Sequence, residues 1–136
     1  MKPVLKRIQT LDVQLPTEPG ALARVYGNFR EAGVNVIASW AYEISPTDAR
    51  AHFYVEDLEK TRKVLTTMGF KPSTSHCVWF EADDKMGSYA ELLGKIGKAN
   101  IQIGATDAFA IGNRFATVIF PREEKSFEPL CKAVGV

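Results

Sequence analysis

Residues 16–22, Pro-Thr-Glu-Pro-Gly-Ala-Leu, separate two hydrophobic patterns of different period. Before them, apolar and polar residues alternate over 8–15, which predicts a strand. After them, apolar residues recur at helical spacing over 21–32, and Gly33 follows as a stop signal. The stretch is therefore a turn that connects a strand to a helix.

Two residues of this turn favour close approach of another molecule. Pro19 lacks an N–H, which costs nothing where the first donors of a helix are unpaired in any case. Gly20 has no Cβ, so a ligand can reach the free N–H groups beside it. Those groups and the helix dipole favour an anion such as a carboxylate. Taken alone, the turn favours a plain connection between two elements over a ligand site.

The turn occurs twice, because Gly87 stands 67 residues after Gly20 (87 − 20 = 67). The strand and helix residues around it repeat at the same offset, which indicates an internal duplication of a unit about half the chain long. The matched pairs include Leu11 with Val78, Val13 with Phe80, Leu15 with Ala82, Val25 with Leu92, Phe29 with Ile96 and Val36 with Ile103.

Each unit reads as strand, helix, strand, strand, helix. A short extended piece over 70–75 closes the first unit, whereas the second has almost no closing strand. Right-handed crossovers then place both helices on one face of an antiparallel sheet. We expect an α+β fold of two ferredoxin-like βαββαβ units, over 1–73 and 74–136. The expected strands are 8–15, 34–42, 49–55, 76–82, 101–109 and 114–120, and the expected helices are 21–32, 58–68, 89–99 and a short last one capped by Ser126.

The composition excludes several classes of protein. The chain has 136 residues, 46% hydrophobic and 24% charged, with a net charge of +1. These values predict a packed fold and argue against a nucleic-acid partner. No apolar run approaches a membrane span, and the N-terminus lacks a signal-peptide core. Cys77 and Cys131 form no metal pattern, so we expect two reduced, mostly buried thiols in the cytoplasm.

The sequence offers no candidate for catalysis. His52 and His76 have no Asp, Glu or Cys at ligand spacing, which argues against a metal site. No nucleophile stands beside a base, and no phosphate loop is present. We expect a protein that is not an enzyme and that carries no cofactor.

The two units resemble a tandem pair of ACT domains. Residues 17–23 and 32–36 are similar to the family's D-x-P-G-x-L-A turn and its A-G-I-N-I second strand, with Thr17 in place of the aspartate. In the second unit, residues 84–87 resemble D-K-P-G with Met86 in place of the proline, and residues 100–103 resemble the second strand. The resemblance covers nearly the whole chain.

The resemblance implies regulation by a small ligand, often a free amino acid, held where units meet. The family uses the turn and the start of the second strand for this purpose. Carried over, the ligand-binding residues are Glu18, Pro19, Gly20, Ala21 and Leu22 with Asn35, and Met86, Gly87, Ser88 and Tyr89 with Gln102.

Two other functions remain open at this point. One is a regulatory subunit that docks on a partner metabolic enzyme without a ligand of its own. The other is RNA binding, because RNA-recognition domains share this topology and residues 114–120 are similar to their third-strand motif. Thr117 stands where that motif needs an aromatic residue, and the chain lacks the required positive charge.

The helix-free face of the second unit reads as apolar. Its residues Trp79, Ala116, Val118 and Phe120 form a patch too large to leave in water. Either the first unit or a second chain covers it. Because the resemblance suggests that the two sheets lie edge to edge, we expect a homodimer closed by two-fold symmetry over this patch. We also expect the two units to unfold in one cooperative transition, because neither has much core of its own.

Overall fold

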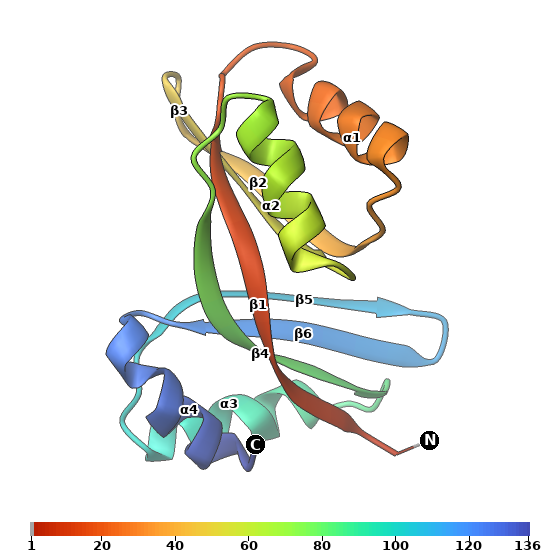
Figure 1. The fold of residues 1–136 in the computed structure, drawn as a ribbon. Helices are drawn as coiled ribbons and strands as arrows, with labels where there is room; N and C mark the ends of the chain where they lie inside the picture. The colour runs from red at the N-terminus through yellow and green to blue at the C-terminus, as the bar shows by residue number, and fades with distance from the viewer. Residues whose placement is uncertain (1) are drawn as a thin grey trace. The chain divides into compact units, whose positions relative to one another are not determined.

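The computed structural model describes residues 2–136 and contains four α-helices and six strands (Figure 1). It divides into a first unit, residues 9–75, and a second unit, residues 76–136 together with the residues up to Ile8. The elements are β1 (Val4–Leu15), α1 (Ala21–Ala32), β2 (Val36–Ser45), β3 (Asp48–Val55), α2 (Leu58–Thr67), β4 (Ser73–Asp83), α3 (Ser88–Lys98), β5 (Ile103–Ile111), β6 (Arg114–Pro121), a 3₁₀ turn (Glu124–Ser126) and α4 (Phe127–Val134).

The first unit is a ferredoxin-like layer of helices on an antiparallel sheet. β3 pairs with β1, with Leu11 opposite Phe53, and β2 pairs with the other edge of β3. Both α1 and α2 cover one face of this sheet (Figure 1). Alternation along β1 sends its apolar residues to the helices, and Phe29 of α1 meets Phe53 edge to face at 5.1 Å between ring centroids. The buried core consists of Leu11, Val13, Leu15, Val25, Phe29, Ala51, Phe53, Val55 and Leu65.

The helices of the first unit begin where the sequence predicts. Asp57 caps α2, and its side chain accepts a hydrogen bond from the Lys60 amide at 3.1 Å. In α1 the fully buried residues are Ala21, Val25 and Phe29. Leu22 and Tyr26, expected on the same face, lie at its rim and are each 36% exposed.

The second unit repeats this arrangement with β4, β5 and β6 and helices α3 and α4. β6 pairs with β4 and with β5, both antiparallel. Pro129 falls in the first turn of α4, where proline is tolerated, and α4 is shorter than α2, as predicted. The buried core consists of Val78, Leu92, Ile96, Ile119, Phe127, Leu130, Cys131 and Val134.

The second unit has no strand after α4, as expected, and the start of β1 takes that role. Residues of β1 up to Ile8 belong to this unit, and β1 is the neighbour of β4 in the strand order. Arg7 fastens this segment to α4: its guanidinium donates to Glu128 Oε1 at 2.8 Å and to the Val136 carbonyl at 3.2 Å. The guanidinium also lies 5.8 Å from the ring centroid of Phe127. The sequence did not predict a strand over 4–7.

Both units carry a β-bulge at the same place in the repeat. The register shifts between Val36 and Ala38 in the first unit and between Ile103 and Ala105 in the second, so the extra residues are Ile37 and Gly104. These two positions are 67 residues apart, the offset of the duplication. The bulge is therefore a feature of the repeated unit, in line with the conservation of bulges as designed features.

We expect Gly104→Ala to destabilise the protein by about 1–3 kcal/mol, because a Cβ would lie 2.8 Å from Arg122 Cα and 2.9 Å from the Pro121 carbonyl oxygen. The matched control is Gly97→Ala in α3, where a Cβ meets nothing within 4 Å. That change should stabilise by about 0.5–1 kcal/mol through helix propensity. Urea denaturation of both variants measures the difference, and equal stabilities would show that the bulge tolerates a side chain.

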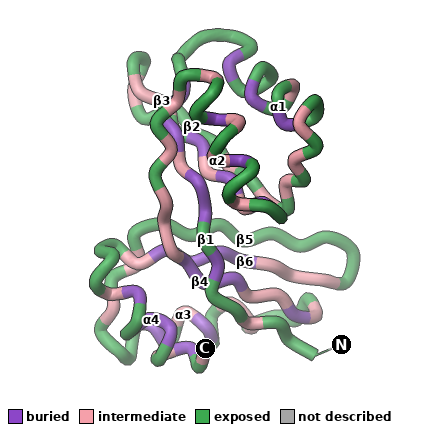
Figure 2. Tube along the Cα trace, in the orientation of Figure 1, coloured by how far each residue is buried: buried purple, intermediate pink, exposed green. Residues whose placement is uncertain are grey.

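The expected apolar patch of the second unit is not exposed. Trp79, Val118 and Phe120 are 6%, 2% and 9% exposed within the single chain. Figure 2 shows buried stretches along β4 and β6. The Trp79 indole N–H donates to Glu81 Oε1 at 2.9 Å and, with the Arg114 guanidinium, holds the pKa of that carboxyl below its usual range. This face is therefore buried within the chain and is not the open surface over which a dimer was expected. The homodimer itself stays a prediction.

Candidate functional site

The two glycine turns have the same backbone geometry. Gly20 has φ 85° and ψ −3° before α1, and Gly87 has φ 88° and ψ −9° before α3. Both values lie in the left-handed region, which a residue with a Cβ enters only at a cost. In each turn the next amide bonds back to the carbonyl three residues earlier, from Ala21 to Glu18 at 3.3 Å and from Ser88 to Lys85 at 3.2 Å. The duplication thus extends to the conformation of the turns.

The start of α1 presents hydrogen-bond donors beside Gly20. The Arg24 amide bonds the Gly20 carbonyl at 3.0 Å, which is the first hydrogen bond of the helix. The amides of Leu22 and Ala23 precede it and have no intrahelical acceptor. Together with the helix dipole they form the positive end of α1, which suits a carboxylate.

A cavity of about 400 Å³ opens at this turn. Four of the predicted ligand-binding residues line it, namely Glu18, Pro19, Ala21 and Leu22, and Gly20 lies between them in the chain. Leu15, Pro16, Thr17, Ala41, Tyr42, Glu43 and Ala49 complete the lining. Two carboxylates line the cavity. Glu18 forms an ion pair with Arg24 at 2.6 Å, whereas Glu43 is not paired with Arg24.

Asn35 lies away from this cavity. It stands just beyond the other end of α1, a helix of 12 residues and about 18 Å in length. Its side chain donates to Glu56 Oε2 at 2.8 Å, and its carbonyl accepts from the Glu56 amide at 3.0 Å. Within the first unit, Gly20 and Asn35 are therefore not brought to one small ligand.

The predicted ligand-binding residues of the second unit also lie in different places. Met86 is fully exposed, Ser88 lines a cavity of about 410 Å³, and the Tyr89 hydroxyl bonds Thr106 Oγ1 at 2.7 Å. Gln102, at the far end of α3, donates to the Ile103 carbonyl at 3.2 Å. Gln102 therefore lies apart from the Gly87 turn.

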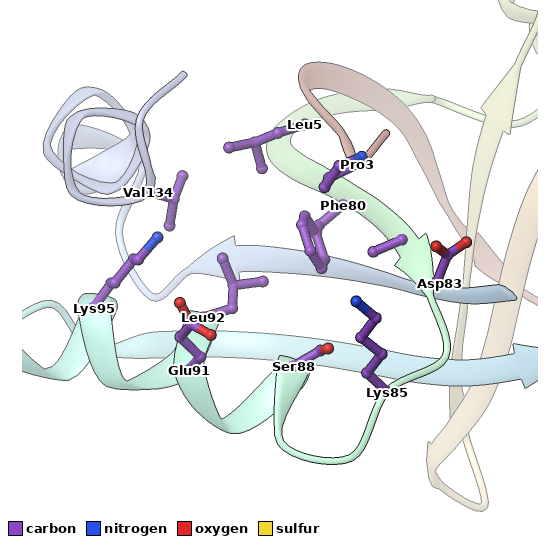
Figure 3. Close-up of a pocket in the computed structure, with 11 residues that line it drawn as sticks. Pro3, Leu5, Phe80, Asp83, Lys85, Ser88, Glu91, Leu92, Lys95 and Val134 are labelled. Carbon is purple, nitrogen blue, oxygen red and sulfur yellow. The ribbon is translucent and has the colours of Figure 1, made fainter. Parts of the chain in front are cut away.

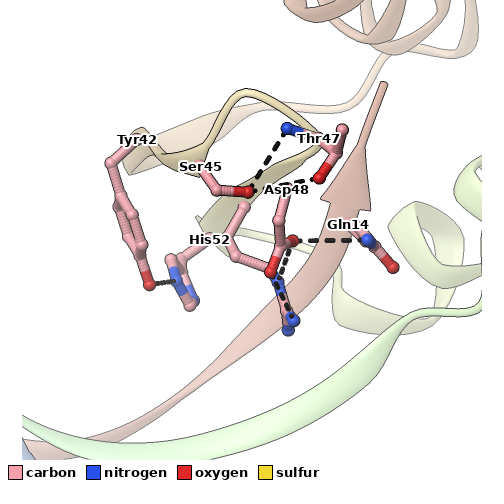
Figure 4. Close-up of polar contacts among 7 residues, drawn as sticks. Gln14, Tyr42, Ser45, Thr47, Asp48 and His52 are labelled. Carbon is pink, nitrogen blue, oxygen red and sulfur yellow. Dashed lines mark hydrogen bonds and ion pairs between the residues drawn. The ribbon is translucent and has the colours of Figure 1, made fainter. Parts of the chain in front are cut away.

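A polar cluster on the helix-free face of the first unit was not predicted. Asp12 is its centre: Oδ1 lies 2.7 Å from His52 Nδ1 and 2.8 Å from Thr10 Oγ1, and Oδ2 accepts from the Ser75 hydroxyl. The Tyr42 hydroxyl lies 2.9 Å from His52 Nε2 (Figure 4). Asp12 and His52 are cross-strand partners 40 residues apart in the sequence, so no local motif indicates their contact. The closed set of hydrogen bonds marks this cluster as structural.

Among residues 2–136 no group of three or more His, Cys, Asp or Glu side chains could hold a metal ion. Cys77 and Cys131 are buried and are not joined by a disulfide, and burial raises the pKa of the Cys131 thiol. No helix in the described part of the chain is long and apolar enough to cross a bilayer.

The chain matches no protein-family model and no curated protein sequence. It does match solved structures over nearly its whole length. Protein BT0572 from Bacteroides thetaiotaomicron shares 21% identity at a TM-score of 0.81, covering 94% of this chain and 88% of that one. The ligand-free regulatory subunit of aspartate kinase from Thermus thermophilus shares 16% identity at a TM-score of 0.68, covering 98% and 95%.

A second aspartate kinase regulatory subunit, from Thermus flavus, shares 18% identity at a TM-score of 0.60, with coverage of 98% and 95%. These likenesses, all below 25% identity, concern the fold. The fold expected from the sequence is thereby confirmed: the chain has a tandem ACT-type fold.

Proposed function

We propose that this protein is a non-catalytic regulatory protein that binds a free amino acid at the Gly20 turn. The observation that carries the proposal is the cavity of about 400 Å³ into which the turn and the start of α1 open. Its volume falls within the usual range for small-molecule sites, about 300–1,000 Å³. The neighbours named as regulatory subunits of aspartate kinase support a regulatory role.

The lining suits the three parts of an amino acid. The free amides at the start of α1 would receive the carboxylate. Glu43 would receive the ammonium group, because it is a carboxylate of the lining. Leu15, Leu22 and Ala41 offer apolar surface to a side chain.

We infer an allosteric role in the cytoplasm, exerted as a homodimer or on a partner metabolic enzyme. The named aspartate kinase subunits are the ground for an enzyme partner. A regulatory subunit that docks without its own ligand is the second candidate, favoured by the separation of Asn35 from the turn.

A thermal-shift screen of the common amino acids tests the proposal. A ligand that binds only the folded state must raise the melting temperature, by an amount set by its concentration relative to its Kd. We expect one or a few amino acids to do so at millimolar concentration. Gly20→Val should abolish the shift, because its side chain would occupy the approach to the amides and strain a φ of 85°.

Gly87→Val is the matched control, since it imposes the same strain at φ 88° on the other turn. The Gly20 site is supported if only Gly20→Val loses the ligand-induced shift. If no amino acid stabilises the unmodified protein, the docking subunit becomes the better interpretation, and co-purification of an enzyme would then support it.

A further inference from the structure

The second unit contains a cavity that the proposed function does not use. It has a volume of about 410 Å³ and lies between the inner side of α3, the end of β4, the start of β1 and the end of α4. Figure 3 shows Phe80 and Leu92 in its middle, with Lys85 and Lys95 at opposite ends. The full lining is Pro3, Leu5, Phe80, Ala82, Asp83, Lys85, Ser88, Glu91, Leu92, Lys95 and Val134.

The duplication supplies an internal comparison for this cavity. At the offset of 67, Lys85 and Glu91 correspond to Glu18 and Arg24 of the first unit. Glu18 and Arg24 form an ion pair at 2.6 Å. In the part of the chain that the structure describes, Lys85 and Glu91 form no such pair, although their charges are also opposite.

The floor differs between the units as well. Ala82 of the second unit stands where the first unit has Leu15, which fills its position at 7% exposure. The smaller side chain leaves room beside Phe80, which is half-buried, whereas its counterpart Val13 is 3% exposed. The second unit therefore has a cavity with an apolar floor, and among the described residues Lys85 and Glu91 at its rim form no ion pair with each other. At the same place in the first unit, Leu15 fills the space and Glu18 pairs with Arg24.

The charges at the two ends of the cavity are unequal. Glu91 and Lys95 stand four residues apart on α3, so at that end a negative and a positive charge offset each other. At the other end, Asp83 is engaged by Arg114 at 3.1 Å. Among the described residues of the lining, Lys85 is the cation at this end, where Ser88 also lies. The end that holds Lys85 and Ser88 is therefore the place for an anion.

We propose that this cavity binds a carboxylic acid with an apolar body and no cationic group. The carboxylate lies against Lys85 and Ser88, and the apolar body lies on Phe80, Leu92 and Leu5. An aliphatic or aromatic acid fits this description, whereas the ammonium group of a free amino acid would meet Lys85 unfavourably. The site is separate from the Gly20 turn, and it does not depend on the function proposed there.

Titration calorimetry with three probes of one shape tests the charge requirement. The probes are 3-phenylpropionate, 3-phenylpropan-1-ol and 3-phenylpropylamine, which share an apolar body and differ in the charge of one end. We expect the acid to bind at least tenfold more tightly than the alcohol, and the amine to bind most weakly. Lys85→Glu, which installs the residue type of the first unit, should weaken the acid at least tenfold and strengthen the amine.

Lys98→Glu is the matched control, because it makes the same change of charge at a residue of α3 that does not line the cavity. It should leave the affinity for the acid within about twofold, since an exposed charge away from the site is screened. The proposal is overturned if the acid does not bind the unmodified protein, if acid and alcohol bind equally, or if both lysine variants lose the acid alike. Retention of acid binding in Gly20→Val would show that the two sites are independent.

Discussion

Replacing Asp12 with alanine is expected to lower the free energy of unfolding by about 3–5 kcal/mol, the cost of removing one partner from a buried, hydrogen-bonded polar set. Its side chain is 14% exposed and accepts hydrogen bonds from the Thr10 and Ser75 hydroxyls while contacting His52. Because Thr10 is fully buried, water cannot replace Asp12 as the hydrogen-bond acceptor of its hydroxyl. All these groups lie in the first unit, and urea denaturation followed by circular dichroism measures the loss.

Asp48→Ala provides the control for this substitution. Asp48 also bonds two side chains, Arg50 at 3.1 Å and Gln14 at 3.3 Å (Figure 4). Both of these partners are exposed. Its removal should cost less than about 1 kcal/mol, the usual value for a surface pair. Asp12→Asn retains one acceptor oxygen and should fall between the two. An Asp12→Ala variant no less stable than Asp48→Ala would show that the cluster is solvated.

Deleting residues 2–8 is expected to unfold the second unit altogether. The deletion removes Leu5 and Ile8 from the apolar interior, and it leaves β4 with an edge of unpaired backbone groups. It also removes Arg7, which fastens the segment to Glu128 and Val136. Because net stabilities of domains are only about 5–15 kcal/mol, the loss of a strand exceeds what such a unit can tolerate. Nuclear magnetic resonance would show collapsed amide dispersion for residues 76–136.

A deletion of Lys2 and Pro3 alone is the matched control, since both residues precede β1. This shorter deletion should leave the amide spectrum of the second unit folded. If the longer deletion also leaves it folded, the segment is an accessory strand and the unit is complete without it.

The sequence predicted the elements of both units because their signals are local. The alternation in β1, the cap at Asp57 and the glycines at 20 and 87 each act within a few residues. The offset of 67, which falls to 66 after the shorter second hairpin, then carried the assignments from one unit to the other. The bounds of α1 were predicted to the residue, and the other elements to within a few residues.

What the sequence could not predict depends on residues far apart in the chain. The segment at Lys6 and Arg7 interrupts the alternation with two charges, so the start of β1 was not identified as a strand. Asp12 and His52 meet across 40 residues, and the burial of Trp79 depends on packing that no local pattern reports. The turn at Gly20 was predicted because its signal is local, whereas the position of Asn35 relative to that turn depends on the length of α1.

The use of the start of β1 in the second unit has a consequence for how the chain folds. Arg7 reaches partners 121 and 129 residues further along, so this contact closes a very long loop. Folds rich in such distant contacts have high contact order and fold slowly. During synthesis, Leu5 and Ile8 are made before β4 and α4, against which they are later buried. Until those elements exist, the two side chains are exposed to water and to other chains. Lys6 and Arg7 stand between these two apolar residues, and their charges oppose aggregation of the segment while it is unpaired.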